Sequence, residues 1–148
     1  MSTTICFDFG NTRLKAAIFK GNQLEKLEHL ENDAVTSVQK ILDQYKPSKT
    51  LLSSVIHHDK AIESLLAEYG PFHLLGPSTQ LNFTTPVGKP ETIGADRLGL
   101  VAAAVDLYPA EHSLVICLGT CITYNFVNNR GQFWEAASLQ GCRCVLSL

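Results

Sequence analysis

The segment DFGNT near the start of the chain combines an acidic side chain, a glycine turn and a hydroxyl group. Gly10 lacks the side chain that would keep an anion away from the backbone, so the N–H groups of the turn can approach a phosphate closely. The hydroxyl of Thr12 adds a donor. Asp8 stands at the mouth of the turn, where a carboxylate can hold Mg²⁺ against nucleotide phosphates, directly or through water. These residue types in this spacing predict a phosphate-binding hairpin.

The same arrangement occurs a second time along the chain. Set side by side, ICFDFGNTRLKAAIF and LVICLGTCITYNFV each read as an apolar strand, a glycine, a threonine and an outgoing strand. Gly119 and Thr120 supply the glycine and the threonine of the second copy. A single short motif of this kind is more often a plain hairpin turn than a phosphate site. Two copies toward opposite ends of the chain favour two phosphate-binding hairpins.

The elements that position the first hairpin are strands and helices in alternation. Alternating apolar residues predict strands at 3–9, 14–19 and 23–30, joined by turns. A helix follows, capped by Asp33 and ended by Pro47. Its apolar face consists of Val35, Val38, Ile41, Leu42 and Tyr45.

Further along, the pattern predicts a buried strand at 51–56, a helix at 60–69 and a short strand at 72–75. Residues 76–90 are rich in Pro, Gly, Ser and Thr, which predicts a long exposed connection. Strands first and then alternating helices and strands indicate an α/β fold.

A second helix-and-hairpin group follows the connection. The segment PETIGADRLGLVAAAVDLYP predicts a helix with Gly94-Ala95-Asp96-Arg97 as its first turn and Pro109 after its end. Taken alone, Asp96 is explained by its favourable interaction with the helix dipole. The apolar face of this predicted helix consists of Leu98, Val101, Ala102 and Val105. Strands are predicted at 114–118 and 121–127, with a turn at 128–131, whereas residues 132–148 show no clear strand or helix period.

Composition limits the class of protein. A chain of 148 residues with 45% hydrophobic residues can bury a real core in one ordinary domain or two small ones. Twelve basic against 14 acidic residues leave no surplus of positive charge, so nucleic acid is not an expected partner. The sequence has no apolar run long enough to span a bilayer, and MSTT does not resemble a signal peptide. We therefore expect no membrane partner and a cytoplasmic protein.

The five cysteines do not predict a disulfide framework, because their number is odd and Cys6 and Cys117 lie in apolar strands. Together with Cys121, these are interpreted as core residues. Cys142 and Cys144 form one C-x-C pair, which supplies too few ligands for a closed zinc site.

Together the motifs resemble a known family. DFGNTRLKAAIF, PETIGADR and LGTCITYNF match, in order and spacing, the motifs of the type III pantothenate kinases, bacterial enzymes of the first step of coenzyme A synthesis. The resemblance covers about residues 5–131, and GADR between two hairpins is its most specific part. It implies the duplicated actin and hexokinase-like (ribonuclease H-like) fold, whose two domains close on ATP. Residues 1–110 would form the first domain and residues 111–148 the start of an incomplete second one.

The resemblance also implies the reaction: phosphoryl transfer from ATP to the hydroxyl of pantothenate, giving 4′-phosphopantothenate, with Mg²⁺ and a monovalent cation, K⁺ or NH₄⁺. Asp96 would be the base that accepts the substrate proton, and Arg97 would contact pantothenate within the segment Gly94-Ala95-Asp96-Arg97. Family members are usually homodimers. The residues that would bind ATP phosphates are Asp8, Gly10, Asn11, Thr12, Gly119 and Thr120, with Asp8 also at Mg²⁺.

The chain departs from the family pattern at three positions. Cys117 stands where the second motif usually begins with Asp, and Asn125 stands where a later acidic residue is common. Val87 is the nearest match to a substrate-site tyrosine. Fewer carboxylates near the phosphates would weaken Mg²⁺ binding or catalysis. Two alternatives therefore stay open: another kinase or phosphatase of the superfamily, which would have no reason for GADR, and a non-catalytic regulatory or interaction module.

The last residues suggest a change of reading frame. The family continues with Gly-Gly-x-Ile-x-Pro-Gly where this chain has FWEAASLQGCRCVLSL. We hypothesise that one nucleotide is lost after the codon of Phe133, since permitted codons read one base earlier can restore that motif. Residues 134–148 would then be an out-of-frame tail of a truncated kinase, inactive or prone to aggregate, and the strands within 114–127 would lack sheet neighbours. Sequencing the gene across codons 129–148 tests this hypothesis.

Overall fold

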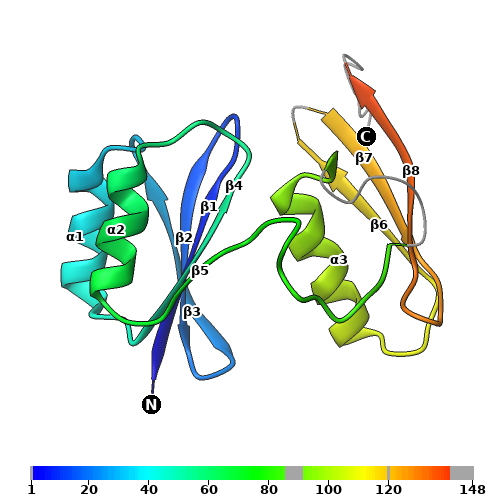
Figure 1. The fold of residues 1–148 in the computed structure, drawn as a ribbon, viewed down its shortest axis with the longest axis horizontal. Coiled ribbons are helices and arrows are strands. Elements are labelled where there is room, and N and C mark those ends of the chain that lie inside the picture. The colour runs from blue at the N-terminus through cyan, green and yellow to red at the C-terminus, as the bar shows by residue number, and fades with distance from the viewer. Residues whose placement is uncertain (1, 86–91, 120, 141–148) are drawn as a thin grey trace, which may run out of the picture. The chain divides into compact units, whose positions relative to one another are not determined.

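The computed structural model describes residues 2–85, 92–119 and 121–140. Contacts within the chain divide it into two compact units (Figure 1). The N-terminal unit comprises Met1–Thr79 with Gly94–Asp96, and the C-terminal unit comprises Gln80–Ile93 with Arg97–Leu148. Both units combine strands with helices or a helix, as the α/β prediction requires.

The N-terminal unit is built on a five-stranded sheet in the order β3-β2-β1-β4-β5. β1 pairs antiparallel with β2, and β2 with β3, whereas β4 runs parallel to β1 and to β5. β4 begins and ends two residues earlier than predicted. Thr50 fits inside the start of the strand because its buried hydroxyl donates to Leu66 O at 3.2 Å. The strands are β1 (Thr3–Phe9), β2 (Leu14–Lys20), β3 (Gln23–Leu30), β4 (Lys49–Ser54) and β5 (Phe72–Leu74).

Two helices, α1 (Val35–Tyr45) and α2 (Lys60–Glu68), lie side by side on one face of this sheet (Figure 1). Alternate residues of a strand point to opposite faces, so every second residue of β1 packs beneath the helices. The predicted apolar face of α1 is confirmed, with Val38 and Leu42 fully buried. The buried core of the unit consists of Ile5, Phe7, Phe9, Ala16, Ile18, Val38, Leu42, Leu52, Ile62 and Leu66.

The start of α1 differs from the prediction that Asp33 caps it. Ala34 occupies the N-cap position and makes no side-chain cap. The side chain of Asn32 takes over, because its Oδ1 accepts hydrogen bonds from the Ala34 N–H at 3.1 Å and from Ser37 Oγ at 2.7 Å. An Asx-type turn just before the helix therefore replaces the predicted cap.

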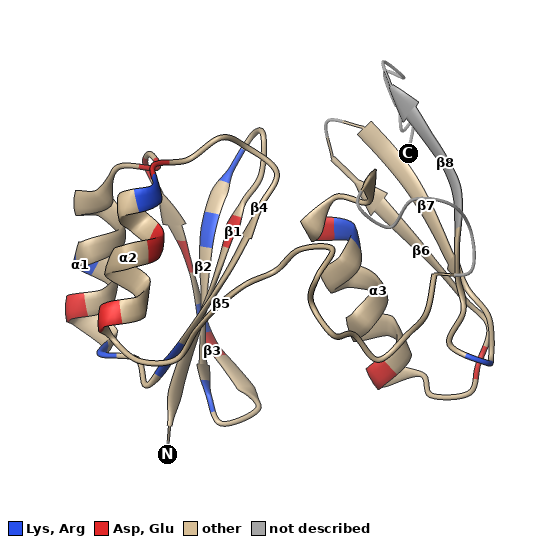
Figure 2. Cartoon of the chain, viewed as in Figure 1, with Lys and Arg blue, Asp and Glu red and all other residues tan. Residues whose placement is uncertain are grey.

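Charged residues of both signs are interspersed along the helices and strands of the N-terminal unit, as Figure 2 shows. The two helices are also joined by polar side chains: the Tyr69 hydroxyl donates to Asp43 and accepts from Gln39. None of the helices in the described part of the chain is long and apolar enough to cross a membrane.

The C-terminal unit pairs one helix with a three-stranded antiparallel sheet in the order β6-β7-β8. Leu98 and Val101 lie on the buried face of the helix and share a core with Val127 and Phe133 of the sheet. Ala102 and Val105 pack against the same core, which confirms the predicted apolar face of the helix. Figure 1 shows the helix beside this sheet. The elements are α3 (Ala95–Leu107), β6 (Ser113–Leu118), β7 (Cys121–Val127) and β8 (Phe133–Gln140).

The prediction that residues 132–148 lack strand structure is wrong for β8. Turn chemistry returns the chain beside β7: Asn128 Oδ1 accepts from the N–H groups of Arg130 and Gln132 at 3.0 Å each, and Gly131 adopts a positive φ of 67°. Backbone pairing with β7 then extends the strand without a strong side-chain pattern. β7 thus has a neighbour on each side, contrary to the expectation for residues 114–127, whereas Leu114, Ile116 and Leu118 of β6 are exposed.

The connection predicted to be exposed at 76–90 is anchored in part. Phe83 is buried and packs edge-on against Phe133, with ring centroids 5.9 Å apart. The Thr84 N–H donates to Gly131 O, and the Phe133 N–H donates to Thr84 O, both at 2.8 Å. Residues 86–90, including Val87, lie outside the described residues, as do Cys142 and Cys144.

The three described cysteines, Cys6, Cys117 and Cys121, are half-buried and not fully buried core residues as predicted. Burial raises the pKa of the Cys6 thiol.

Candidate functional site

The first predicted phosphate hairpin is formed by β1 and β2. Asp8 pairs in register with Lys15, and Phe9 with Leu14, so the turn consists of residues 10–13. The Gly10 N–H donates to Arg13 O at 3.2 Å and closes the turn. A Cβ at Gly10 would also lie 3.2 Å from Arg13 O, so the glycine allows the tight closure.

The second predicted hairpin, between β6 and β7, is shorter than the first. Leu118 pairs with Ile122, and the Gly119 N–H donates to Cys121 O at 3.1 Å. The hydrogen bond that closes the first turn joins residues three positions apart, whereas the one that closes the second joins residues two positions apart. The two copies therefore share sequence order without sharing turn geometry. Thr120 lies outside the described residues.

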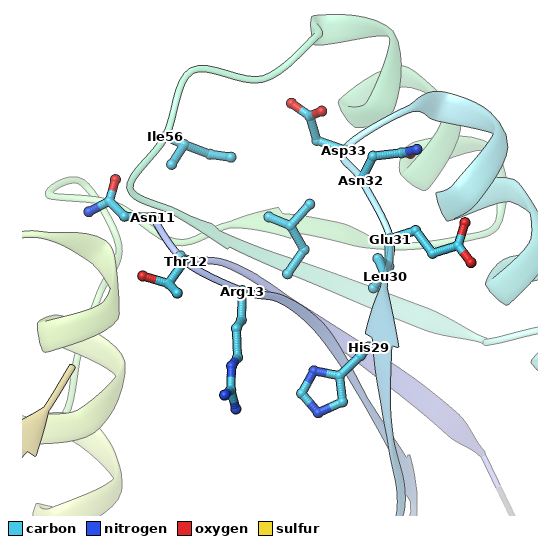
Figure 3. A pocket seen from close by; sticks show the side chains of 11 residues that line it. Asn11, Thr12, Arg13, His29, Leu30, Glu31, Asn32, Asp33 and Ile56 are labelled. Atoms are coloured by element: carbon cyan, nitrogen blue, oxygen red, sulfur yellow. The ribbon is translucent and has the colours of Figure 1, made fainter. Parts of the chain in front are cut away.

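A hollow of about 330 Å³ lies beside the first turn (Figure 3). Gly10, Asn11 and Thr12 line one part of it, and the end of β3 with residues 31–33 lines another. Figure 3 shows the side chains of Arg13 and His29 extending away from Ile56. Sequence reasoning missed the residues at 29–33, because nothing in their types marks them as neighbours of the turn before the β2–β3 pairing is known.

Asp8 lies on the sheet face opposite to α1 and α2, since its neighbours Phe7 and Phe9 are buried beneath those helices. It is half-buried, and its carboxylate lies 3.9 Å from Lys15 Nζ. Burial raises the pKa of Asp8, the charge of Lys15 opposes this shift, and the carboxylate of Asp96 adds to it. The net shift of the pKa is upward, so the charged form of Asp8 is disfavoured by the fold.

This shift predicts how stability depends on pH. The folded state holds the Asp8 proton more tightly than the unfolded state, so stability falls as pH rises from the ordinary carboxyl pKa of 3.8 to the raised folded value. We expect Asp8→Asn to be more stable than wild type at pH 7 and about as stable near pH 3, as measured by thermal unfolding across pH.

A matched control variant is Asp43→Asn. The Tyr69 hydroxyl, and then Gln39, hold the pKa of Asp43 below its usual range, so the sign is reversed and this variant should lose stability at pH 7. Equal stability changes for the two variants at pH 7 would contradict the assignment for Asp8.

Asp96 stands in the first turn of α3, and the structure places it close enough to Asp8 for their charges to interact. A Cβ on Gly94 would lie 2.6 Å from Asp96 Oδ1 and 3.7 Å from Val55 Cγ1. The Asp96 carboxylate therefore folds back over residue 94, into space that a Cβ at this position would share. Asp8, Gly94, Ala95 and Asp96 all belong to the N-terminal unit.

Arg97 belongs to the C-terminal unit, where it is buried to 9% exposure. Its Nε donates a hydrogen bond to Asn125 Oδ1 at 2.7 Å. Asn125 is fully buried, and its Nδ2 donates to Val115 O and to Thr123 Oγ1, each at 3.3 Å. Sequence reasoning noted Asn125 only as a departure from an acidic residue. The available signal was its spacing from Val127, which places a polar side chain on the inward face of β7.

The described residues fit a hard cation at Asp8, because carboxylate oxygens are the preferred ligands of Mg²⁺. Among the residues that the structure describes, no three His, Cys, Asp or Glu side chains gather as a metal site. Any Mg²⁺ at Asp8 would therefore complete its coordination with phosphate oxygens and water, as is usual for this ion.

Comparisons with known proteins agree with the motifs. A sequence model of the type III pantothenate kinases matches residues 4–147. The type III pantothenate kinase of Christiangramia forsetii is 37% identical over 123 residues, which cover 82% of this chain and 51% of that protein. That of Bacteroides fragilis strain YCH46 is 32% identical over 130 residues, 87% of this chain and 54% of that protein. The chain spans about half the length of the curated relatives that it matches.

A solved structure from Bacteroides thetaiotaomicron, described as a protein with an actin-like ATPase fold and unknown function, matches with a TM-score of 0.50. The match covers 96% of this chain and 71% of that one at 9% identity, so it bears on the fold alone. The predicted actin-like fold class is thereby confirmed. By the family match and the order of its motifs, the chain belongs to the type III pantothenate kinase family.

Proposed function

We propose that this chain carries the substrate and phosphate sites of a type III pantothenate kinase, which phosphorylates pantothenate to 4′-phosphopantothenate with ATP in the first step of coenzyme A synthesis. One observation carries the proposal: Asp8 of the first hairpin and Asp96 of the GADR segment belong to one compact unit and interact through their charges. Phosphoryl transfer needs a nucleotide-phosphate carboxylate and a base near each other.

In the proposed reaction, Asp96 accepts the proton of the pantothenate hydroxyl while that oxygen attacks the γ-phosphorus of ATP, and the bond from this phosphorus to the bridging oxygen breaks as ADP leaves. Gly94 leaves the Asp96 carboxylate room to turn back over the chain. Asp8 would hold Mg²⁺, which would supply positive charge beside the phosphates.

The remaining roles are distributed over both units. The turns at Gly10 and Gly119 present backbone N–H groups to phosphate oxygens, with Asn11, Thr12 and Thr120 as side-chain donors. Arg97 binds the carboxylate of pantothenate, since a guanidinium pairs with a carboxylate through two parallel hydrogen bonds. Gly94 and Ala95 complete the segment that carries Asp96 and Arg97.

The proposal includes a monovalent cation, K⁺ or NH₄⁺, a homodimer and a cytoplasmic location, all supported by the family alone. It also includes the division of the chain into a first actin-like domain at 1–110 and part of a second at 111–148. The compact units defined by contacts divide the chain elsewhere, and the reading-frame hypothesis for 134–148 stays a prediction.

The test is ADP release from ATP in the presence of Mg²⁺, K⁺ and the purified chain, with and without pantothenate. The proposal expects release that depends on pantothenate and yields phosphopantothenate detectable by mass spectrometry. The same release without pantothenate would point to another superfamily kinase or phosphatase. ATP binding with no release under any condition would favour the non-catalytic module, which Cys117 and Asn125 at usually acidic positions also favour.

A further inference from the structure

We propose that Asn125 is a positioning residue, which holds the guanidinium of Arg97 through Nε, so that a substrate carboxylate cannot bind it side-on. The consequence for pantothenate rests on the proposed function. The positioning itself rests on the contacts of the C-terminal unit.

The first step is the direction of the hydrogen bond from Arg97. A guanidinium can meet a carboxylate side-on, through Nε and one terminal nitrogen, or end-on, through both terminal nitrogens. Arg97 Nε already donates to Asn125 Oδ1 at 2.7 Å. This bond excludes the side-on geometry and, because Nε lies in the guanidinium plane, restricts the orientation of that plane.

The second step is the orientation of the Asn125 amide. Its Nδ2 lies 3.3 Å from two acceptors, Val115 O and Thr123 Oγ1. A flipped amide would direct N–H groups at the N–H of Arg97 and an oxygen at the carbonyl of Val115, so one orientation satisfies the network. Since Asn125 is fully buried, water cannot replace these partners easily. The acceptor for Arg97 is therefore held in place.

The third step explains why the residue is an amide. An Asp at 125 would keep an acceptor for Arg97 Nε but would place its second oxygen against Val115 O, where the structure has a donor. It would also add a negative charge next to the guanidinium. Asn125 thus orients Arg97 without adding charge.

The hydrogen bonds of Asn125 also connect Arg97 to particular strands. Val115 lies on β6 and Thr123 on β7, the two strands that carry the Gly119 turn. Arg97 in α3 is therefore tied to the second hairpin through Asn125. Asn125 therefore links the arginine proposed to bind the substrate to the hairpin proposed to bind phosphate, and both lie in the same unit.

The first measurement is the exchange of the Arg97 Nε–H with water by ¹H–¹⁵N NMR, with the signal assigned by its loss in Arg97→Lys. We expect slow exchange in wild type and exchange at least about tenfold faster in Asn125→Ala. The matched control is Asn82→Ala, which removes a different hydrogen bond to α3, from Asn82 Nδ2 to Ala102 O, and should leave the Arg97 signal unchanged. Unchanged exchange in Asn125→Ala, or fast exchange in wild type, overturns the positioning.

The second measurement is pantothenate affinity by titration calorimetry, which does not need turnover. We expect binding about 10- to 100-fold weaker in Asn125→Ala, with ATP affinity changed less than about twofold. Asn125→Asp should keep the slow Nε–H signal, so it separates the effect of charge from that of orientation. If Asn125→Ala does not fold, Asn125→Ser, which keeps a small acceptor, takes its place in both measurements.

The two claims fail in different ways. If wild type does not bind pantothenate, the proposed function fails, and the NMR exchange still decides the positioning. If Nε–H exchange accelerates in Asn125→Ala but this variant binds pantothenate as tightly as wild type does, the role of Asn125 in substrate binding is overturned.

Discussion

Replacing Asp96 by Asn is expected to reduce pantothenate-dependent ADP release on the order of 10²- to 10⁴-fold. Asn has nearly the size of Asp and can occupy the same space over Gly94, but it cannot accept the proton of the substrate hydroxyl. The fold should therefore survive while the proposed proton transfer is lost. The measurement is the steady-state rate of ADP release at saturating ATP and pantothenate.

The matched control is Asp106→Asn, which changes an exposed carboxylate near the other end of α3. Its rate should stay within about twofold of wild type, in line with the small effects of most surface substitutions. A second measurement, of ATP binding, distinguishes a role of Asp96 as base from a role in Mg²⁺ binding. Because the Asp96 charge raises the pKa of Asp8, Asp96→Asn should lower that pKa and leave Mg²⁺-dependent ATP binding unchanged or tighter. A near wild-type rate in Asp96→Asn would exclude Asp96 as the base.

The largest expected effect on stability comes from Leu52→Ala in the N-terminal unit. Leu52 lies fully buried on β4, packed among the side chains beneath α1 and α2. Truncating a buried leucine removes apolar contacts and leaves a cavity, which costs about 2–5 kcal/mol of unfolding free energy. Urea unfolding followed by far-ultraviolet circular dichroism measures this loss.

Leu24→Ala provides the comparison, because Leu24 lies on the edge strand β3 and is 57% exposed. Its expected change is within about 0.5 kcal/mol. Similar losses for both variants would contradict the assigned core. If the slope of the unfolding free energy against urea concentration changes in Leu52→Ala and not in Leu24→Ala, the two units unfold separately.

Much of the N-terminal unit is predictable from sequence because its signals are local. The period-2 pattern of 3–9 and the turn at Gly21-Asn22 give the meander, and the helical period of Val38 and Leu42 gives α1. The cap of α1 was misassigned since Asn32 and Asp33 are both capable acceptors, and only the backbone geometry selects Asn32. β8 was missed because its pairing partner, not its own residues, specifies it.

The site shows the same division between local and non-local information. The hairpin at Gly10 and the helix start at Asp96 follow from residue types, whereas the interaction of Asp8 with Asp96 needs the fold. The hydrogen bond from Arg97 to Asn125 joins residues 28 positions apart and could not be read from either segment. A buried polar residue on a strand face indicates that a partner exists without identifying it.

The close approach of the Asp96 carboxylate to Gly94 means that selection for folding and selection for activity should act differently on residue 94. A methyl group at residue 94 would meet Asp96 Oδ1, which is the movable end of a side chain, and would find Val55 Cγ1 at ordinary contact distance. The protein can therefore accept alanine by rotating the carboxylate, at little cost to folding. A library selected for soluble expression should retain alanine at 94, whereas one selected for growth that depends on the proposed kinase activity should lose it.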